Sequence, residues 1–315
     1  SGIKNNKKKK RRFFHIHFIM SSSQATTRLK HLSNHLTASP MRNVPPESFS
    51  KSQGMKAAGK YKPATTEAEL RVELACAYRI ISHFGWDDGI QNHLTCKVPG
   101  TEDEYLINSY GMGFDEVTAS SLVKINLQGD VLDAGSVSGA VNLAGFNIHG
   151  ALHAVRHDAK CIMHTHQADC AAMASMKCGF LAGLSQHAMI CGQDMVVNHK
   201  YSPTTGPGGE EECALMANTL GDTARVLLLE NHGVITCGET VAEALLRLYY
   251  ITKAAEIQVR AIGRDGVAAV NMMTNQDHLV QMNVGGEYFF KGVADAEFAH
   301  YKRIIDRVNP GYDDL

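Results

Sequence analysis

Helical and strand-like segments alternate between residues 65 and 265, and this alternation limits the possible folds of the chain more than any other feature. Thr66 can cap a first helix at 67–84, where Glu69 is placed to complete a capping box. Further helices are predicted at 144–156, 169–176, 210–220 and 240–262, and strands at 93–98, 104–107, 122–126, 131–132, 161–166, 225–230 and 233–237. Elements that alternate in this way predict an α/β domain that covers 65–265.

Apolar residues at helical spacing predict which helix faces are buried. In the helix at 144–156, the candidate buried positions are Ile148, Leu152 and Val155. The long helix at 240–262 should turn one face inward, made of Ala242, Leu245, Leu246, Tyr249 and Ile257.

The segments on either side of this region have a different composition. Residues 4–12 carry seven lysines and arginines, and sequence rich in Ser, Thr, Asn and Pro continues to Pro63. Because such a composition cannot bury enough apolar area to offset chain entropy, we interpret 1–64 as a flexible leader. The basic run is also typical of nucleic-acid-binding or nuclear import segments. Residues 266–315 are interpreted as a C-terminal extension with one helix, predicted at 294–308.

Charge, apolar runs and cysteines restrict the class of protein. The formal net charge is -1, so no global field favours nucleic acid or an acidic membrane. No apolar run approaches the roughly 20 residues that span a bilayer. The eight cysteines form no C-x-x-C pair, and several, such as Cys76 and Cys237, lie in apolar surroundings. We expect an intracellular protein in a reducing compartment, with no nucleic-acid partner and no membrane span.

Two histidines end the predicted strand at 161–166. Because strand side chains alternate between faces, the imidazoles of His164 and His166 should point the same way. Two imidazoles on one rigid strand make half of a metal site. By itself, an H-x-H pair is more typical of surface histidines, or of core histidines with hydrogen-bond partners, than of a metal site.

A third histidine changes this balance. The apolar strand at 225–230 ends in Asn231-His232-Gly233, and the glycine allows a positive φ or a close backbone approach. A histidine at a strand end lies where sites are usually built in α/β sheets. Three imidazoles that leave one position open are typical of catalytic zinc, which polarises a carbonyl or acidifies a water. We expect His164, His166 and His232 to hold a divalent metal, with zinc favoured and Mn, Fe or Co left open.

From these residues outward, 65–265 resembles the class II aldolase/adducin family. The resemblance is carried by 116–130, by Ala144-Gly145-Phe146 with His149, by the H-x-H pair, by Asn231-His232-Gly233 and by 255–260. It implies a three-layer α/β/α domain, a metal held by the three histidines, and a homotetramer with sites near the subunit interfaces.

The departures from the family pattern concern a sugar-phosphate pocket. Family aldolases that act on sugar phosphates carry a Pro-Ser-Ser-Glu run before a helix histidine, which here resembles His149. The run aligns with Asn142-Leu143-Ala144-Gly145, so Gly145 replaces the glutamate that would move the proton, and apolar residues replace both phosphate-binding serines. Tyr110-Gly111 replaces a Thr-Gly element of the same pocket. These differences argue against a phosphorylated-sugar aldolase.

Other side chains could supply the acid–base function. His149, Tyr110 and His187 are our catalytic candidates, because an imidazole or a phenol can move a proton. One expected function is a metal-dependent lyase of the aldolase or decarboxylase type, acting on a small non-phosphorylated carbonyl compound whose enolate oxygen the metal stabilises. The alternative is a non-catalytic adducin-like module that interacts with actin and spectrin. Animal adducins continue into a basic tail where this chain ends at Asp313-Asp314-Leu315, so we place the enzyme first.

A short motif in the leader concerns location. Arg28-Leu29, followed after five residues by His35-Leu36, resembles the type 2 peroxisomal targeting signal, which a receptor reads near the N-terminus. The motif would be suitably placed if Met20 is the natural start. The lack of acidic residues in 21–42 is also typical of a mitochondrial transit peptide. We expect a cytoplasmic protein, with the peroxisome or glycosome as the alternative through Arg28, Leu29, His35 and Leu36.

Overall fold

The computed structural model describes residues 61–263, apart from 138 and 207, and residues 266–315, apart from the side chains of 276–285, 287 and 288. The basic run and the targeting-like motif lie outside the described residues. Tyr61 and Ala64, at the start of the described chain, both hydrogen-bond the Glu73 carboxylate.

An 8-stranded sheet of order β4-β3-β2-β1-β5-β8-β7-β6 forms the middle layer of the fold. Its strands are β1 His93–Lys97, β2 Tyr105–Ile107, β3 Val123–Ile125, β4 Val131–Asp133, β5 Cys161–Thr165, β6 Val196–His199, β7 Val226–Leu229 and β8 Gly233–Gly238. Neighbouring strands run antiparallel, except that β6 and β7 are parallel. Every residue of β5, β7 and β8 is buried, because helices cover both faces of the sheet there.

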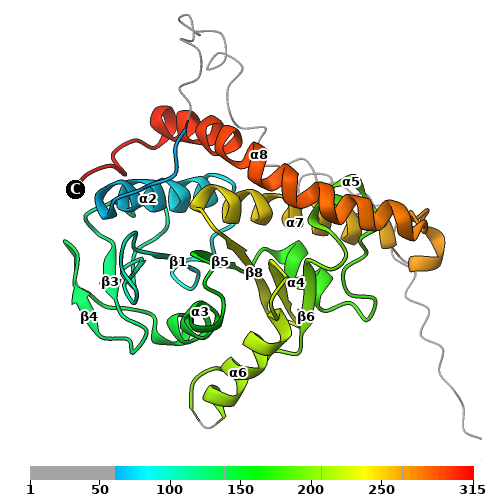
Figure 1. Ribbon diagram of the computed structural model, residues 1–315, viewed down its shortest axis with the longest axis horizontal. Coiled ribbons are helices and arrows are strands. Elements are labelled where there is room, and N and C mark those ends of the chain that lie inside the picture. Colours follow the sequence, from blue (N-terminus) through cyan, green and yellow to red (C-terminus); the bar gives the residue numbers. More distant parts are fainter. Residues whose placement is uncertain (1–60, 138, 207, 264–265) are drawn as a thin grey trace, which may run out of the picture. The chain divides into compact units, whose positions relative to one another are not determined.

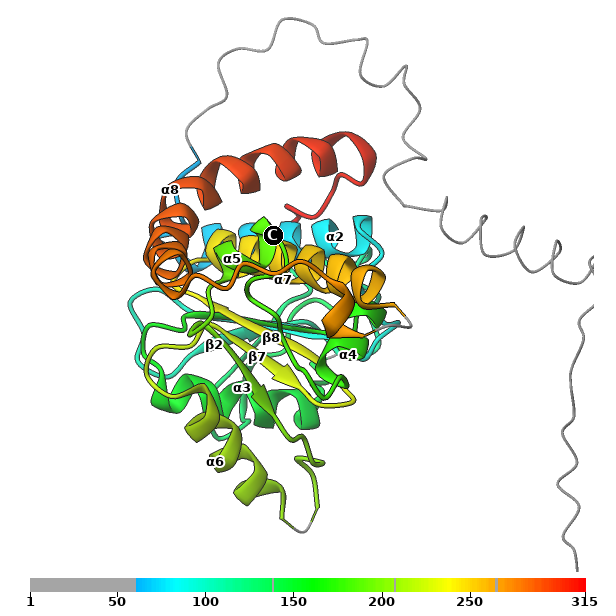
Figure 2. The ribbon, with the colours of Figure 1, turned by 90° about the vertical axis from the view of Figure 1, so that its right-hand side faces the viewer.

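Helices form a layer on each side of the sheet (Figures 1 and 2). One layer contains α2 Glu67–His83, α4 Ala168–Ala174, α5 Gln186–Cys191, α7 Val241–Ile262 and α8 Gln276–Val308, with the short 3-10 helix η3 Val267–Ala269 before α8. The other layer contains α3 Leu143–Val155 and α6 Gly209–Leu220. The predicted three-layer α/β/α architecture is therefore confirmed.

Local signals set the ends of the long helices. Thr66 and Glu69 form the predicted capping box at the start of α2. The Thr240 side chain accepts a hydrogen bond from the Glu243 N–H at the start of α7. Ala242, Leu245 and Leu246 of α7 are buried as predicted, whereas Tyr249 and Ile257 are only half-buried.

Two expectations about the helices need correction, and two elements were not predicted. Val155 is 54% exposed rather than buried, because Ile148 and Leu152 form the inward face of α3 and the helix end lines an open cavity beside α6. The last helix begins at Gln276 rather than near 294. Its first half was not predicted because the two glycines at 285–286 weaken the helical pattern in the sequence. A side chain at Gly286 would lie 2.2 Å from the Ile190 carbonyl oxygen, so glycine permits close packing of α8 on α5. Strand β6 and helix α5 were not predicted.

The C-terminal residues pack against the beginning of the domain. The buried guanidinium of Arg79 in α2 donates hydrogen bonds to Asn309 and to the Pro310 carbonyl. The Ala119 and Ser120 N–H groups donate to the carbonyls of Tyr312 and Asp314. Phe290 and Phe298 of α8 lie in the same hydrophobic core as α2 and α7.

The division of the chain into 1–64, 65–265 and 266–315 stays a prediction.

Candidate metal centre

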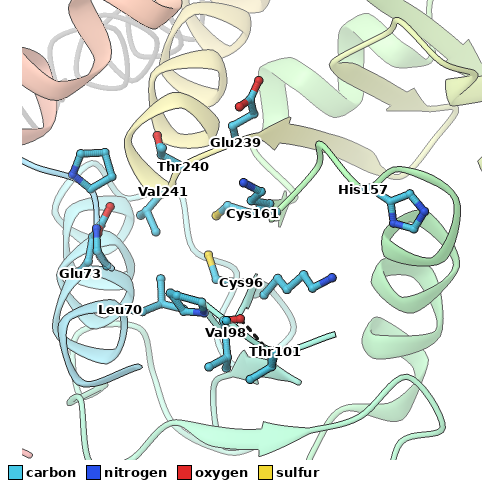
Figure 3. A pocket seen from close by; sticks show the side chains of 16 residues that line it. Leu70, Glu73, Cys96, Val98, Thr101, His157, Cys161, Glu239, Thr240 and Val241 are labelled. Carbon is cyan, nitrogen blue, oxygen red and sulfur yellow. Dashed lines mark hydrogen bonds between the residues drawn. The ribbon is translucent and has the colours of Figure 1, made fainter. Parts of the chain in front are cut away.

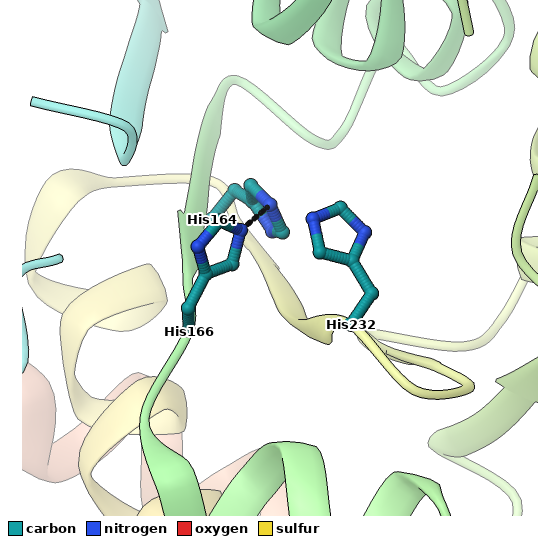
Figure 4. A group of neighbouring side chains, drawn as sticks. All are labelled: His164, His166 and His232. Carbon is teal, nitrogen blue, oxygen red and sulfur yellow. Dashed lines mark hydrogen bonds between the residues drawn. The ribbon is translucent and has the colours of Figure 1, made fainter. Parts of the chain in front are cut away.

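Three histidines converge at the end of strand β5 (Figure 4). His164 is on the same face of this strand as Ile162, which belongs to the core formed with α3 and α6. His164 lies in β5, His166 follows that strand, and His232 lies in the turn between β7 and β8. One ring nitrogen of each histidine lies within 4.8 Å of the other two. The structure thus brings together the three residues that the sequence singled out, because β8 is a direct neighbour of β5.

The turn that carries His232 depends on the two residues beside it. Asn231 has a φ of 58°, which asparagine tolerates better than most residues. A Cβ on Gly233 would lie 2.5 Å from the Thr165 carbonyl oxygen and 2.9 Å from the His166 ring. Of the two roles left open for this glycine, the structure supports the close backbone approach, and the positive φ falls on Asn231.

Hydrogen bonds fix the orientation of two of the three rings. The Nδ1 atom of His164 lies 3.0 Å from the Val234 carbonyl oxygen, which can only accept a hydrogen bond. The Nδ1 atom of His166 lies 3.1 Å from a carboxylate oxygen of Asp88. Both rings therefore carry a hydrogen on Nδ1, and in the neutral form of each ring the lone pair is on Nε2. Such outer partners commonly orient and strengthen histidine ligands of metals.

The two lone pairs face each other. Nε2 of His164 and Nε2 of His166 are 2.9 Å apart, with His232 beside them. Nδ1 of His232 is buried and has no hydrogen-bond partner among the described residues. Two acceptors at this distance repel unless a cation neutralises them. The three residues therefore fit a divalent metal by their donor atoms.

Burial keeps two of these imidazoles in the neutral form that binds metal. It lowers the pKa of His164 well below its usual value, and the neighbouring histidines add to the effect. Burial, followed by the proximity of His166, lowers the pKa of His232 to about 4. At neutral pH these rings are already deprotonated, so metal binding there need not displace a proton.

The three predicted acid–base candidates lie in different surroundings. His149 is fully buried in α3, and its two ring nitrogens lie 3.1 Å from Nδ1 of His93 and 2.8 Å from Oγ1 of Thr95. Tyr110 is 41% exposed. His187 lies in α5, on the other side of the sheet, with its ring 5.4 Å from that of Tyr250. Only His149 is linked to the metal centre within this chain, through His93.

Sequence reasoning missed three residues beside the three histidines. Asp88 orients His166, and the Tyr201 ring lies 4.1 Å from that of His232. His93 faces His164 across the β1–β5 pair, with ring centres 5.1 Å apart. The alternation of His93 and Thr95 on one strand was the available signal, but it does not reveal which strand pairs with β1.

A separate cavity of about 450 Å³ lies at the opposite ends of β1 and β5, on the other face of the sheet (Figure 3). Cys96 and Cys161 lie side by side at its centre, where the two strands pair. Glu73 lines one side, and burial raises the pKa of its carboxyl to about 7. Because this cavity lies away from the three histidines, we assign the candidate chemistry to the histidine site.

Comparison with known proteins places this geometry in a family. The sequence profile of the class II aldolase and adducin N-terminal domain matches residues 72–259. A candidate aldolase of class 2 from Caulobacter vibrioides is 37% identical over 257 residues, which cover 81% of this chain and 96% of the relative. The chain belongs to the class II aldolase and adducin family. This confirms the resemblance drawn from the motifs.

Both branches of the class II aldolase and adducin family are similar to the chain. Alpha-adducin of Rattus norvegicus is 44% identical over 200 residues, which cover 64% of this chain but only 26% of alpha-adducin. A crystal structure of an aldolase II superfamily protein from Pseudomonas syringae has a TM-score of 0.72 and 32% identity, and covers 80% of this chain and 97% of that chain. L-fuculose 1-phosphate aldolase from Glaciozyma antarctica has a TM-score of 0.64 and 25% identity, covering 81% and 97%.

Within the described part of the chain, no helix is both long enough and apolar enough to cross a membrane.

Proposed function

We propose that the chain is a metal-dependent lyase of the aldolase or decarboxylase type, acting on a small carbonyl compound that carries no phosphate. The observation that carries this proposal is the convergence of His164, His166 and His232, with Nε2 of His164 and Nε2 of His166 2.9 Å apart. These residues would hold a divalent ion, for which zinc is the favoured choice. When bound, such an ion stabilises negative charge on a carbonyl oxygen.

The start of helix α3 supports a substrate without phosphate. Phosphate groups commonly bind the free N–H groups at a helix N-terminus. Here the Asn142 side chain accepts the hydrogen bond from the Gly145 N–H. The Leu143 side chain in the first turn is 57% exposed. A helix start that is capped by its own chain and presents an exposed apolar side chain disfavours a phosphate.

The proton-moving residues are also a proposal. Tyr110 is exposed and His187 half-buried, so either could meet a substrate or the site of a neighbouring subunit. His149 has both ring nitrogens engaged, so in this chain it would act through His93. The proposed homotetramer, with sites near its interfaces, would give Tyr110 and His187 access to the metal centre. We also propose that the protein is cytoplasmic and that its substrate is a small molecule.

The test uses the full chain loaded with one equivalent of zinc. A panel of non-phosphorylated aldehydes, hydroxy ketones and β-keto acids is incubated with the protein, and carbon–carbon bond cleavage is followed by product analysis. We expect turnover of at least one compound, lost in His232→Ala and kept in His157→Ala, which changes an exposed histidine away from the site. Turnover that survives His232→Ala, or none with any compound at full zinc occupancy, contradicts the proposal.

An adducin-like interaction module is the second candidate. It is favoured by the 44% identity to alpha-adducin. Its expected partners are actin and spectrin, and binding would not require metal. Co-sedimentation of the full chain with actin and spectrin, with and without chelator, distinguishes the two functions. Metal-independent binding by a chain that turns over no substrate favours the module.

A further inference from the structure

Four buried polar side chains lie between strand β1 and helix α3. His93 and Thr95 come from β1, and His149 and His153 come from α3; none is more than 4% exposed. Nδ1 of His93 lies 3.1 Å from Nε2 of His149. Oγ1 of Thr95 lies 2.8 Å from Nδ1 of His149 and 2.8 Å from Nε2 of His153. Nδ1 of His153 lies 2.8 Å from the Ala159 carbonyl oxygen. These contacts make one continuous chain of hydrogen bonds.

The Ala159 carbonyl sets the direction of every bond in this chain. A carbonyl only accepts, so Nδ1 of His153 carries a hydrogen and donates it. Burial lowers the pKa of His153 to about 3, so the ring is neutral and its Nε2 accepts from the Thr95 hydroxyl. The Thr95 oxygen, having donated its hydrogen, accepts from Nδ1 of His149. Nε2 of His149 then accepts from Nδ1 of His93. Nε2 of His93 is left as a bare lone pair.

The His93 ring lies where the side chain of residue 145 would lie. A Cβ built on Gly145 would be 2.2 Å from Nε2 of His93, so the imidazole fills the space that any side chain at this position would need. Nε2 has no hydrogen-bond partner among the described residues, and unlike Nδ1 of His232 it is not enclosed by protein. The His93 ring is also next to His164 of the metal centre.

We propose that His93 takes the place of a side chain at residue 145 and offers its Nε2 to the substrate as a hydrogen-bond acceptor. The substrate half of this statement rests on the proposed function, whereas the arrangement of His93 does not. Thr95, His149 and His153 are positioning residues, because they act on the substrate only by holding His93 in one tautomer. Gly145 is required because His93 needs its space.

The tautomer can be measured without any substrate. The full chain is labelled with ¹⁵N-histidine, loaded with zinc and observed by long-range ¹H–¹⁵N correlation at neutral pH. We expect His93, His149 and His153 each to carry a hydrogen on Nδ1 and none on Nε2. A hydrogen on Nε2 of His93, or a zinc-induced shift showing that this nitrogen binds the metal, overturns the proposal.

The variants at Thr95 test whether the chain of hydrogen bonds sets this tautomer. Thr95→Val keeps the shape of the side chain but removes the hydroxyl, so we expect His93 to lose its single Nδ1–H form. Thr95→Ser keeps the hydroxyl and should keep the tautomer. Should Thr95→Val leave His93 in the Nδ1–H form, the proposed positioning role is wrong.

A double-mutant cycle tests whether the His93 ring occupies the space that a side chain at residue 145 would need. Gly145→Ala should lower the urea midpoint of the full chain, because the added carbon overlaps the imidazole. In the His93→Ala background the space is free, so Gly145→Ala should lower the midpoint no further. An equal loss in both backgrounds contradicts the proposal. The tautomer and the urea midpoint can be measured on a protein that turns over no substrate. An inactive protein would therefore contradict the proposed lyase, whereas the arrangement of His93 could still be tested.

Discussion

Gly233→Ala is the substitution whose effect follows most directly from the structure. The added carbon would lie 2.5 Å from the Thr165 carbonyl oxygen, whereas real Cβ atoms essentially never come closer than 3.0 Å to another atom. The opposing atom belongs to the backbone, so a side-chain rotation cannot relieve the overlap. Strand β8 must therefore move away from β5 at the Thr165–Val234 pair. Overpacking of this kind costs about 1–3 kcal/mol, and we expect the free energy of unfolding to fall by about 2 kcal/mol.

The same displacement should weaken metal binding. The added carbon would also lie 2.9 Å from Cδ2 of His166, so the ring of this candidate ligand is pushed, whereas Cε1 of His164 at 3.4 Å stays in ordinary contact. Disturbing the groups that orient metal ligands typically costs about 10–100-fold in affinity. We expect zinc affinity, measured by competition with a chromogenic chelator, to fall at least about tenfold.

Gly150→Ala is the matched control for this experiment. Gly150 lies inside α3, and the nearest atom to its added carbon is in the Phe146 ring at 3.5 Å, an ordinary contact. Replacing a glycine by alanine within a helix stabilises it by about 1 kcal/mol, so the urea midpoint should rise and zinc affinity should stay unchanged. If Gly233→Ala matches the wild type in both urea midpoint and zinc affinity, the close approach of β8 to the ligand rings is not what the structure indicates.

Four further predictions concern acid, metal, substrate and assembly. The pKa of His153 is about 3 in the fold and roughly 6.5 in the unfolded chain, which binds more protons between these values, so stability falls as the pH falls through this range. Urea unfolding of chelator-treated protein should show roughly 3 kcal/mol lost from this residue at pH 4.5. Zinc present at about 100 times its dissociation constant should add about 2.7 kcal/mol to the free energy of unfolding, and a chelator should abolish this gain in a thermal scan. The full chain should not cleave fuculose or rhamnulose phosphates, and turnover on the order of 10 per second in a coupled assay would contradict our interpretation of Gly145. Light scattering at micromolar concentration should give the mass of a tetramer, and a monomer would refute the expected assembly.

The sequence predicted most of the fold and singled out the three histidines of the candidate metal centre, because short-range signals define both. The period of two in β5 put His164 and His166 on one side, and the end of β7 placed His232 in a turn. His93 could not be found in this way. Its place depends on β1 pairing with β5 so that His93 faces His164, and this register is not encoded by local periodicity. The role of Gly145 was also visible only as a missing acid until the His93 ring was seen in its space.

The first half of α8 was missed for a similar reason. Gly286 weakens the helical signal within the chain, but it allows close contact with the Ile190 backbone of α5. Val155 shows the opposite error, since its helical spacing is correct but no helix or strand among the described residues covers that end of α3. Local periodicity gives the face of a helix, and the partner that covers the face is set by tertiary packing.

The contacts of Arg79 with Asn309 and Pro310 have a consequence for how the protein is made. During synthesis Arg79 must wait for residues 230 positions further along, which at about 5–20 residues per second takes roughly 10–50 s. The three histidines are made within that time, and His232 precedes Asn309 by 77 residues (309 minus 232), or roughly 4–15 s at the same rate. During these last seconds the three histidines of the candidate site are all present while one side of the core is still open. Nascent chains that stall before residue 309 is made should be cut by proteases in the part of the core that is still open. Chains that stall only after residue 314 has left the ribosome should resist cleavage.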